Sequence, residues 1–457
     1  MKPTILRQNK PLLLSLAAGL TCAGLYVFAY GGLWAGPYWP GLGITVITWL
    51  LLAAGCVICR PHMNGESLFL TACALLLSGA YALFGSVTMK ALNLPVLLFL
   101  TVQALMSLAG LSDRPALSPA SLWTGLCRFL GALFVHWPVP FRALRSARGD
   151  SARLRGLGWG LLLAVLVLAV VLPLLISADA VFGQGVRALT QEASLENALP
   201  FLGKLLRTAL LGMLLFSFLY ALSQPRREMK TEPPPHRPAL PFAVLCAALC
   251  AVYAAFVYVQ FRYLFGGAET ALLKGGYAQY ARSGFFQLVA VALINLAVLG
   301  ITVLLADPRG ALRALCLLLT ALTGVILVSS FWRMRLYILA YGLSTLRLLT
   351  LWAMAMITCA LALTAFRLLL PTRRVFSLLA ALILAAWVGL NYLNVDALIA
   401  RYNTAAYAAG RLETADLDYL RALSPDVIPF LGEAEYPAEN FAALPWFCRD
   451  ASLRHLK

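Results

Sequence analysis

The chain has 457 residues, of which 61% are hydrophobic and only 12% are charged, and its mean hydropathy is +0.82. Soluble globular domains carry about 25% charged residues, so this composition excludes an ordinary soluble fold. The formal net charge is +17, and the placement of its lysines and arginines favours membrane topology and contact with anionic lipids over a nucleic-acid interface.

About eleven apolar stretches follow one another along the chain. A helix needs about 20 apolar residues to cross the hydrocarbon core, and in lipid its backbone must satisfy its own hydrogen bonds. The sequence therefore predicts an all-α, polytopic transmembrane helical bundle of about eleven spans. The predicted spans are residues 11–29, 41–59, 67–88, 92–111, 156–177, 200–222, 240–261, 285–306, 312–332, 348–370 and 375–393.

The distribution of lysine and arginine predicts the orientation of these spans. With the N-terminus in the cytoplasm, twenty basic residues fall on the cytoplasmic side and ten in the opposite loops. Cytoplasmic loops of membrane proteins carry such an excess. An odd number of spans then places the C-terminal tail outside, and from Asn394 onward it holds six basic and nine acidic residues.

Four blocks describe the expected organisation: an N-terminal four-span block (1–111), a basic cytoplasmic loop (112–155), a seven-span block (156–393) and an extracytoplasmic tail (394–457). In the loop, apolar residues such as Leu122, Leu126 and Leu133 recur at helical spacing and predict a helix lying in the interface. The arginines that follow attract anionic headgroups, so anionic membrane lipids are the expected partners. Nothing in the sequence indicates a protein partner.

Chemistry-bearing residues are scarce inside the predicted spans. No Asp or Glu lies in any of the eleven, and all four histidines fall in loops or the tail. The chain also lacks phosphate-binding, zinc-protease and serine-nucleophile motifs. We therefore expect no metal and no cofactor, and we favour a protein that is not an enzyme. The few polar residues within spans are expected to join helices by hydrogen bonds: Gln103, Gln287, Asn295 and Asn391.

The richest polar region lies at the predicted outer helix ends. Gly342 can end one helix, Ser344 or Thr345 can cap the next, and Arg347 then lies in its first turn, where the helix dipole also favours an anion. Two further segments, around Arg282 and around Asp396, would converge there. The candidate site residues are Arg282, Arg333, Arg335, Tyr337, Tyr341, Arg347, Asn394, Asp396, Arg401 and Asn403.

Three of these segments have recognisable sequence: Tyr277-Ala278-Gln279-Tyr280-Ala281-Arg282, the run from Arg333 to Arg347, and Asn394-Val395-Asp396-Ala397. Together with Leu417-Asp418-Tyr419-Leu420-Arg421 in the tail they resemble a bacterial family of polytopic membrane proteins catalogued as domain of unknown function 4173. The resemblance covers residues 277–430. One departure is Ser283, where that family tends to carry an acidic residue. The resemblance implies a multi-pass protein of the bacterial inner membrane and supplies no established activity.

The outer cluster has two interpretations. In the structural one, Asp396 neutralises the arginines and latches the tail over the bundle, so we predict Asp396 within salt-bridge reach of Arg282, Arg333, Arg335 or Arg347. In the functional one, the arginines bind a phosphate or carboxylate. We favour a non-enzymatic membrane component for sensing, scaffolding or regulation. The alternatives are a transporter of an anionic solute, or a lipid-dependent transferase of the outer leaflet with Asp396 as base.

Overall fold

The computed structural model describes residues 3–30, 41–59, 61–112, 116–146, 195–224, 237–265, 285–306, 308–370, 375–412, 416–431, 436 and 448–455. These residues form helices and turns, and no strand occurs among them. The chain divides into two compact units. Unit 1 comprises Met1–Ala116, Ala120–Arg227 and Glu439–Leu453, and unit 2 comprises Leu117–Pro119, Glu228–Ala438 and Arg454–Lys457.

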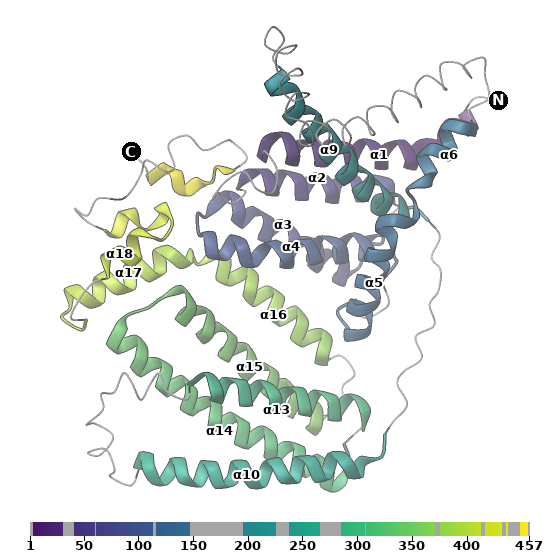
Figure 1. The fold of residues 1–457 in the computed structure, drawn as a ribbon. Helices are drawn as coiled ribbons and strands as arrows, with labels where there is room; N and C mark the ends of the chain where they lie inside the picture. Colours follow the sequence, from purple (N-terminus) through teal and green to yellow (C-terminus); the bar gives the residue numbers. More distant parts are fainter. Residues whose placement is uncertain are drawn as a thin grey trace, which may run out of the picture. The chain divides into compact units, whose positions relative to one another are not determined.

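Unit 1 is built from antiparallel helices that pack against their neighbours in the sequence (Figure 1). The first and last helices of the unit also pack together, and the rings of Phe28 and Phe201 lie 5.7 Å apart at this contact. A Cβ on Gly19 would lie 2.7 Å from the carbonyl oxygen of Gly212, so this contact depends on the missing side chain. The helices are α1 (Pro3–Tyr30), α2 (Leu42–Ile58), α3 (Gly65–Leu83), α4 (Val87–Leu108) and α9 (Leu195–Ala221).

One end of unit 1 carries the helix predicted in the basic loop. It forms α5 (Pro119–Val135), which is followed by α6 (Pro138–Ser146). The Arg128 guanidinium donates to the carbonyl of Leu111 after α4, and the backbone N–H of His136 donates to Ser217 Oγ of α9 at 3.1 Å. Large apolar side chains of α5 stay exposed, with Trp123 at 67%. An apolar face of this kind suits a helix at the membrane interface.

The opposite end of unit 1 holds a segment from the C-terminal tail. The N–H of Leu42, at the start of α2, donates to the Arg449 carbonyl at 2.9 Å. Asp450 forms an ion pair with Lys90 in the first turns of α4. The hydroxyl of Tyr81 donates to the backbone carbonyl of Lys90 at 2.7 Å. The tail therefore completes a polar cluster where α2 and α4 begin, which is the outer side in the predicted topology.

The described part of unit 2 contains long helices and the first part of the tail (Figure 1). Asn295 Nδ2 donates to Thr323 Oγ1 at 3.0 Å and joins two of the long helices, as expected for this asparagine. The long helices are α10 (Ala239–Phe265), α13 (Phe285–Leu305), α14 (Gly310–Tyr341), α15 (Thr345–Leu369) and α16 (Val375–Tyr392). The tail adds α17 (Val395–Ala408), α18 (Leu417–Arg421) and the 3-10 helix η2 (Pro425–Phe430), while the 3-10 helix η5 (Ala451–His455) follows Asp450.

The all-α polytopic membrane fold is confirmed. Within the described residues, nine helices are long and apolar enough to cross a membrane, and α2 is a shorter apolar helix of 17 residues. The span predicted at 156–177 lies outside the described residues. The division into four blocks follows the order of predicted spans and stays a prediction.

Helix α14 extends well beyond its predicted end at residue 332. Its 32 residues run on to Tyr341, so Arg333, Arg335 and Tyr337 lie on the helix beyond the predicted span, and the helix ends at the position expected from Gly342. Neither proline nor glycine occurs between Trp332 and Gly342, which explains the extension. At 1.5 Å per residue the helix measures about 48 Å, longer than the hydrocarbon core of about 30 Å. Its last turns therefore belong to the interface.

Candidate functional site at the α14–α15 loop

Local sequence determines the turn between α14 and α15 as expected. Gly342 ends α14 with φ of 75°, a left-handed conformation that side-chain-bearing residues rarely adopt. Ser344 is the N-cap of α15, and its Oγ accepts from the Arg347 N–H at 3.5 Å. The turn thus leaves backbone groups of Leu343 and Thr345, both buried, to find hydrogen-bond partners outside the two long helices.

Arg347 connects the start of α15 to the end of α14. Its Nη1 donates to the carbonyl oxygens of Tyr341 at 2.9 Å and of Gly342 at 2.5 Å. The guanidinium also lies 4.2 Å from the ring centre of Tyr337. A cation at a helix C-terminus satisfies carbonyls that have no partner within the helix and complements the negative end of its dipole. Arg347 therefore stabilises the turn, a role that the sequence analysis did not assign to it.

A cavity of about 240 Å³ adjoins this arginine. Arg347, Tyr337 and Ser344 supply its polar wall, while Phe285 and Met334 are among its apolar residues. The cavity brings together the starts of α13 and α15 and the end of α14. Its charge and hydroxyls suit a small anion, as the functional interpretation of the cluster requires.

Helix α17 binds the loop through one side chain. The Oδ1 of Asn403 accepts from the N–H of Leu343 at 2.7 Å, and its Nδ2 donates to the carbonyl of Leu343 at 2.9 Å. The hydroxyl of Tyr419, in α18, accepts from the N–H of Thr345 at 2.9 Å. Two residues of the tail therefore bind the backbone here: Asn403 binds Leu343 in the loop, and Tyr419 binds Thr345 at the start of α15. We call Asn403 and Tyr419 the latch residues.

Asp396 faces the tail and not open solvent. Asn394 caps α17 through the Ala397 N–H at 3.4 Å, and Asp396, two residues later, is only 2% exposed. Its Oδ2 accepts from the Ser424 N–H at 3.1 Å. Arg282 lies outside the described residues, so the predicted ion pair between Asp396 and an outer arginine stays a prediction.

The acidic residues near Ser424 help to raise the pKa of a neighbouring tyrosine. Tyr436 donates its hydroxyl to the carbonyl of Leu423 at 2.7 Å. Burial, and then the negative charges of Asp396 and Asp426, raise the pKa of Tyr436 above its ordinary value of 10.0. A protonated Tyr436 is therefore part of the folded tail.

The remaining predicted residues separate into different environments. Arg333 is buried at 8% exposure within α14, whereas Arg335 and Arg401 are exposed. Tyr341 packs edge to face against Tyr337, with ring centres 5.2 Å apart. Arg335 lies over the ring of Trp332, 5.3 Å from its centre. The structure thus places Tyr337 and Arg347 on one cavity, with Tyr341 packed against Tyr337, and Arg335 on another.

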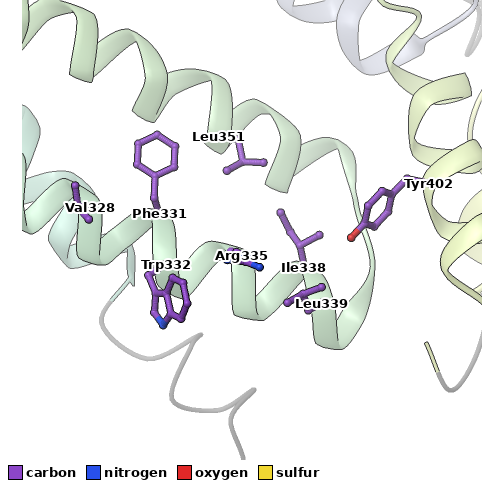
Figure 2. A pocket seen from close by; sticks show the side chains of 8 residues that line it. All are labelled: Val328, Phe331, Trp332, Arg335, Ile338, Leu339, Leu351 and Tyr402. Carbon is purple, nitrogen blue, oxygen red and sulfur yellow. The ribbon is translucent and has the colours of Figure 1, made fainter. Parts of the chain in front are cut away.

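Arg335 lines a larger cavity of about 500 Å³ between α14, α15 and α17. Figure 2 shows most of its residues along α14, with Leu351 across from them on α15 and Tyr402 of α17 at one end, its hydroxyl directed toward the cavity. Apart from Arg335 and Tyr402, the lining is apolar or aromatic: Val328, Phe331, Trp332, Ile338, Leu339 and Leu351.

Sequence reasoning missed several residues of this region. Tyr419 and Ser424 lie in the tail motif that resembled a known family, so that motif was a usable signal for them. Tyr402 also lies in a family-like segment, between the candidate residues Arg401 and Asn403, but its contribution depends on how α17 packs. The sequence also gave no reason to pair Lys90 with Asp450 among many candidate charges.

A known protein family matches most of the chain. Residues 71–434 match the family model described as Domain of unknown function (DUF4153). The chain belongs to this family. The number suggested by the sequence motifs, 4173, was therefore wrong, although an uncharacterised family of membrane proteins was correctly expected. No curated protein and no solved structure matches the chain. This DUF4153 member is an integral membrane protein of unknown function.

Proposed function

We propose that this DUF4153 member is a non-enzymatic component of the bacterial inner membrane, in which the extracytoplasmic tail acts as a latch on the α14–α15 loop and serves sensing or regulation. The observation that carries this proposal is the paired hydrogen bonding of Asn403 to both backbone groups of Leu343. A side chain used in this way fixes the position of one segment on another.

The bonding of the other polar residues supports a structural use of the cluster. Arg347 donates to the end of α14, and Tyr419 accepts from Thr345. Asp396, the base of the transferase alternative, is buried and accepts from the backbone of Ser424. A general base needs a reactive partner within hydrogen-bond reach, and a backbone N–H is not one. These contacts favour the latch over the transferase.

A latch of this size is suited to regulation. Few hydrogen bonds hold α17 and α18 on the loop, and a net hydrogen bond contributes about 0.5–1.5 kcal/mol. An equilibrium between docked and released tail can then be shifted by a ligand or partner that prefers one state. The tail would report an event outside the cell to the membrane helices α14 and α15.

Hydrogen exchange in the purified protein tests the latch. Asn403→Ala removes both contacts with Leu343, and we expect the Leu343 amide to exchange at least tenfold faster, because its N–H loses its acceptor. Tyr419→Phe should accelerate exchange at Thr345 instead. Thr404→Ala is the matched control, since Thr404 donates only within α17. Unchanged exchange at Leu343 in a folded Asn403→Ala protein would refute the latch.

The transporter alternative has one supporting observation, the cavity of about 240 Å³ beside Arg347. Uptake of labelled phosphate into liposomes containing the protein tests it. Uptake that Tyr337→Phe and Arg347→Lys reduce would favour transport over the latch as the main role.

A further inference from the structure

The larger cavity combines an apolar length with a single cation. Its residues on α14 extend from Val328 to Leu339, about three helical turns, within a helix long and apolar enough to span a membrane. Its volume of about 500 Å³ falls within the roughly 300–1,000 Å³ typical of sites that bind small molecules. An apolar length of this kind can hold an acyl chain.

The polar end of the cavity lies at the depth where lipid headgroups are found. Arg335 stands six residues before the end of α14, and its cation lies over Trp332, which is 50% exposed. Tryptophan and tyrosine gather at the membrane interface, where one part of the ring is apolar and the other is wet. Trp332 and Tyr402 therefore place Arg335 at the border between acyl chains and headgroups.

The charge of Arg335 selects the occupant. Among the described residues, the recorded ion pairs are Lys90 with Asp450 and Arg421 with Asp418, and Arg335 takes part in neither. A cation at the membrane border is costly unless an anion or water solvates it. A phosphate forms strong, charge-assisted hydrogen bonds with guanidinium, and the Tyr402 hydroxyl, directed toward the cavity from α17 (Figure 2), can add another.

We propose that the cavity between α14, α15 and α17 binds an anionic phospholipid, with its phosphate on Arg335 and Tyr402 and one acyl chain along Val328, Phe331 and Leu351. This site goes beyond the latch, because it names a ligand class and uses Arg335, which makes no contact with the latch residues in the recorded hydrogen bonds. A phospholipid bound there would contact α14, α15 and the tail at once.

Native mass spectrometry of delipidated protein provides the test, with dioleoyl phosphatidylglycerol and dioleoyl phosphatidylcholine titrated separately. We expect tighter binding of phosphatidylglycerol, and a loss of roughly tenfold in its affinity for Arg335→Gln, since removing one charged hydrogen-bond donor typically weakens binding about this much. Arg401→Gln is the matched control, because Arg401 is an exposed arginine of α17 next to Tyr402 and the substitution removes the same charge.

A second variant tests the acyl part of the site. Leu351→Trp fills the cavity without changing the charge, and it should weaken the binding of phosphatidylglycerol and of phosphatidylcholine to the same extent. Slow exchange of the Leu343 amide confirms that each variant is folded. Equal phosphatidylglycerol affinity for Arg335→Gln and Arg401→Gln would overturn the proposal. Binding of free glycerol phosphate as tight as that of the lipid would overturn the acyl-chain part.

Discussion

Asn403 and Leu343, sixty residues apart, are joined by two hydrogen bonds in which one carboxamide binds both backbone groups of one residue. Leu343 belongs to a connection too short to pair with other backbone, and buried backbone groups need partners. Asn403 therefore supplies the donor and the acceptor that a neighbouring strand would supply in a sheet.

Substitution of Gly342 should weaken this arrangement in two separable ways. In Gly342→Ala, the positive φ of 75° costs about 1 kcal/mol, and the new Cβ would lie 2.7 Å from Asn403 Oδ1. We expect the melting temperature in detergent to fall for both reasons. In an Asn403→Ala background, only the backbone cost remains, so Gly342→Ala should destabilise less there. Additive effects would show that Asn403 does not contact the Gly342 position.

The ion pair between Lys90 and Asp450 should make a large contribution to the stability of unit 1. Their side chains are 6% and 7% exposed. Asp450→Asn leaves a buried charge without its partner, at a cost of about 3–5 kcal/mol. The double variant Lys90→Met, Asp450→Leu should recover most of this loss. Thermal unfolding measures both, and Asp418→Asn, in an exposed ion pair, should change little. A single variant as stable as wild type would contradict the buried pairing.

High pH should destabilise the tail through Tyr436. Because burial and the nearby Asp396 and Asp426 raise the pKa of Tyr436 in the folded state, the folded tail retains a proton that the unfolded tail releases. Its contribution to stability is complete below pH 10, the ordinary pKa, and is lost as the pH rises further. Tyr436→Phe should flatten this dependence, measured as the wild-type minus variant difference in unfolding free energy. Parallel pH curves would exclude Tyr436 as the cause.

Reporter fusions test the predicted orientation. Fusions at Arg145, Lys230 and Arg373 should report the cytoplasm, and fusions at Glu269 and Glu439 should report the outside, because basic residues are retained on the cytoplasmic side. A cytoplasmic signal at Glu439 alone would mean that the number of spans is even.

Local patterns predicted the helical fold and much of the turn chemistry. Apolar length identified the spans, and residue type identified Gly342 as a helix end and Ser344 as a cap. The predicted span ended nine residues before α14 does, because arginine and tyrosine lower hydropathy without interrupting a helix. Hydropathy indicates how readily a residue enters the hydrocarbon core. Capping hydrogen bonds and helix-breaking residues such as glycine determine where a helix ends.

Long-range pairings could not be predicted from the sequence alone. Asn403 was a candidate residue, but its partner is backbone, which every residue carries, so no pattern distinguishes Leu343. Lys90 and Asp450 lie 360 positions apart, and several acidic residues of the tail would have satisfied the same charge argument. Only the packing of α2, α4 and the tail selects between them.

The pairing of Lys90 with Asp450 also constrains the order in which the protein matures. Helix α4 is made early, yet its counter-charge is translated 360 residues later. During synthesis Lys90 must therefore rely on water, lipid phosphates or an insertion factor at the membrane surface. A nascent chain halted before Asp450 keeps an unneutralised lysine in its first block. Assembly of unit 1 is thus complete only after Asp450 has been synthesised and has reached the side of the membrane where α4 begins.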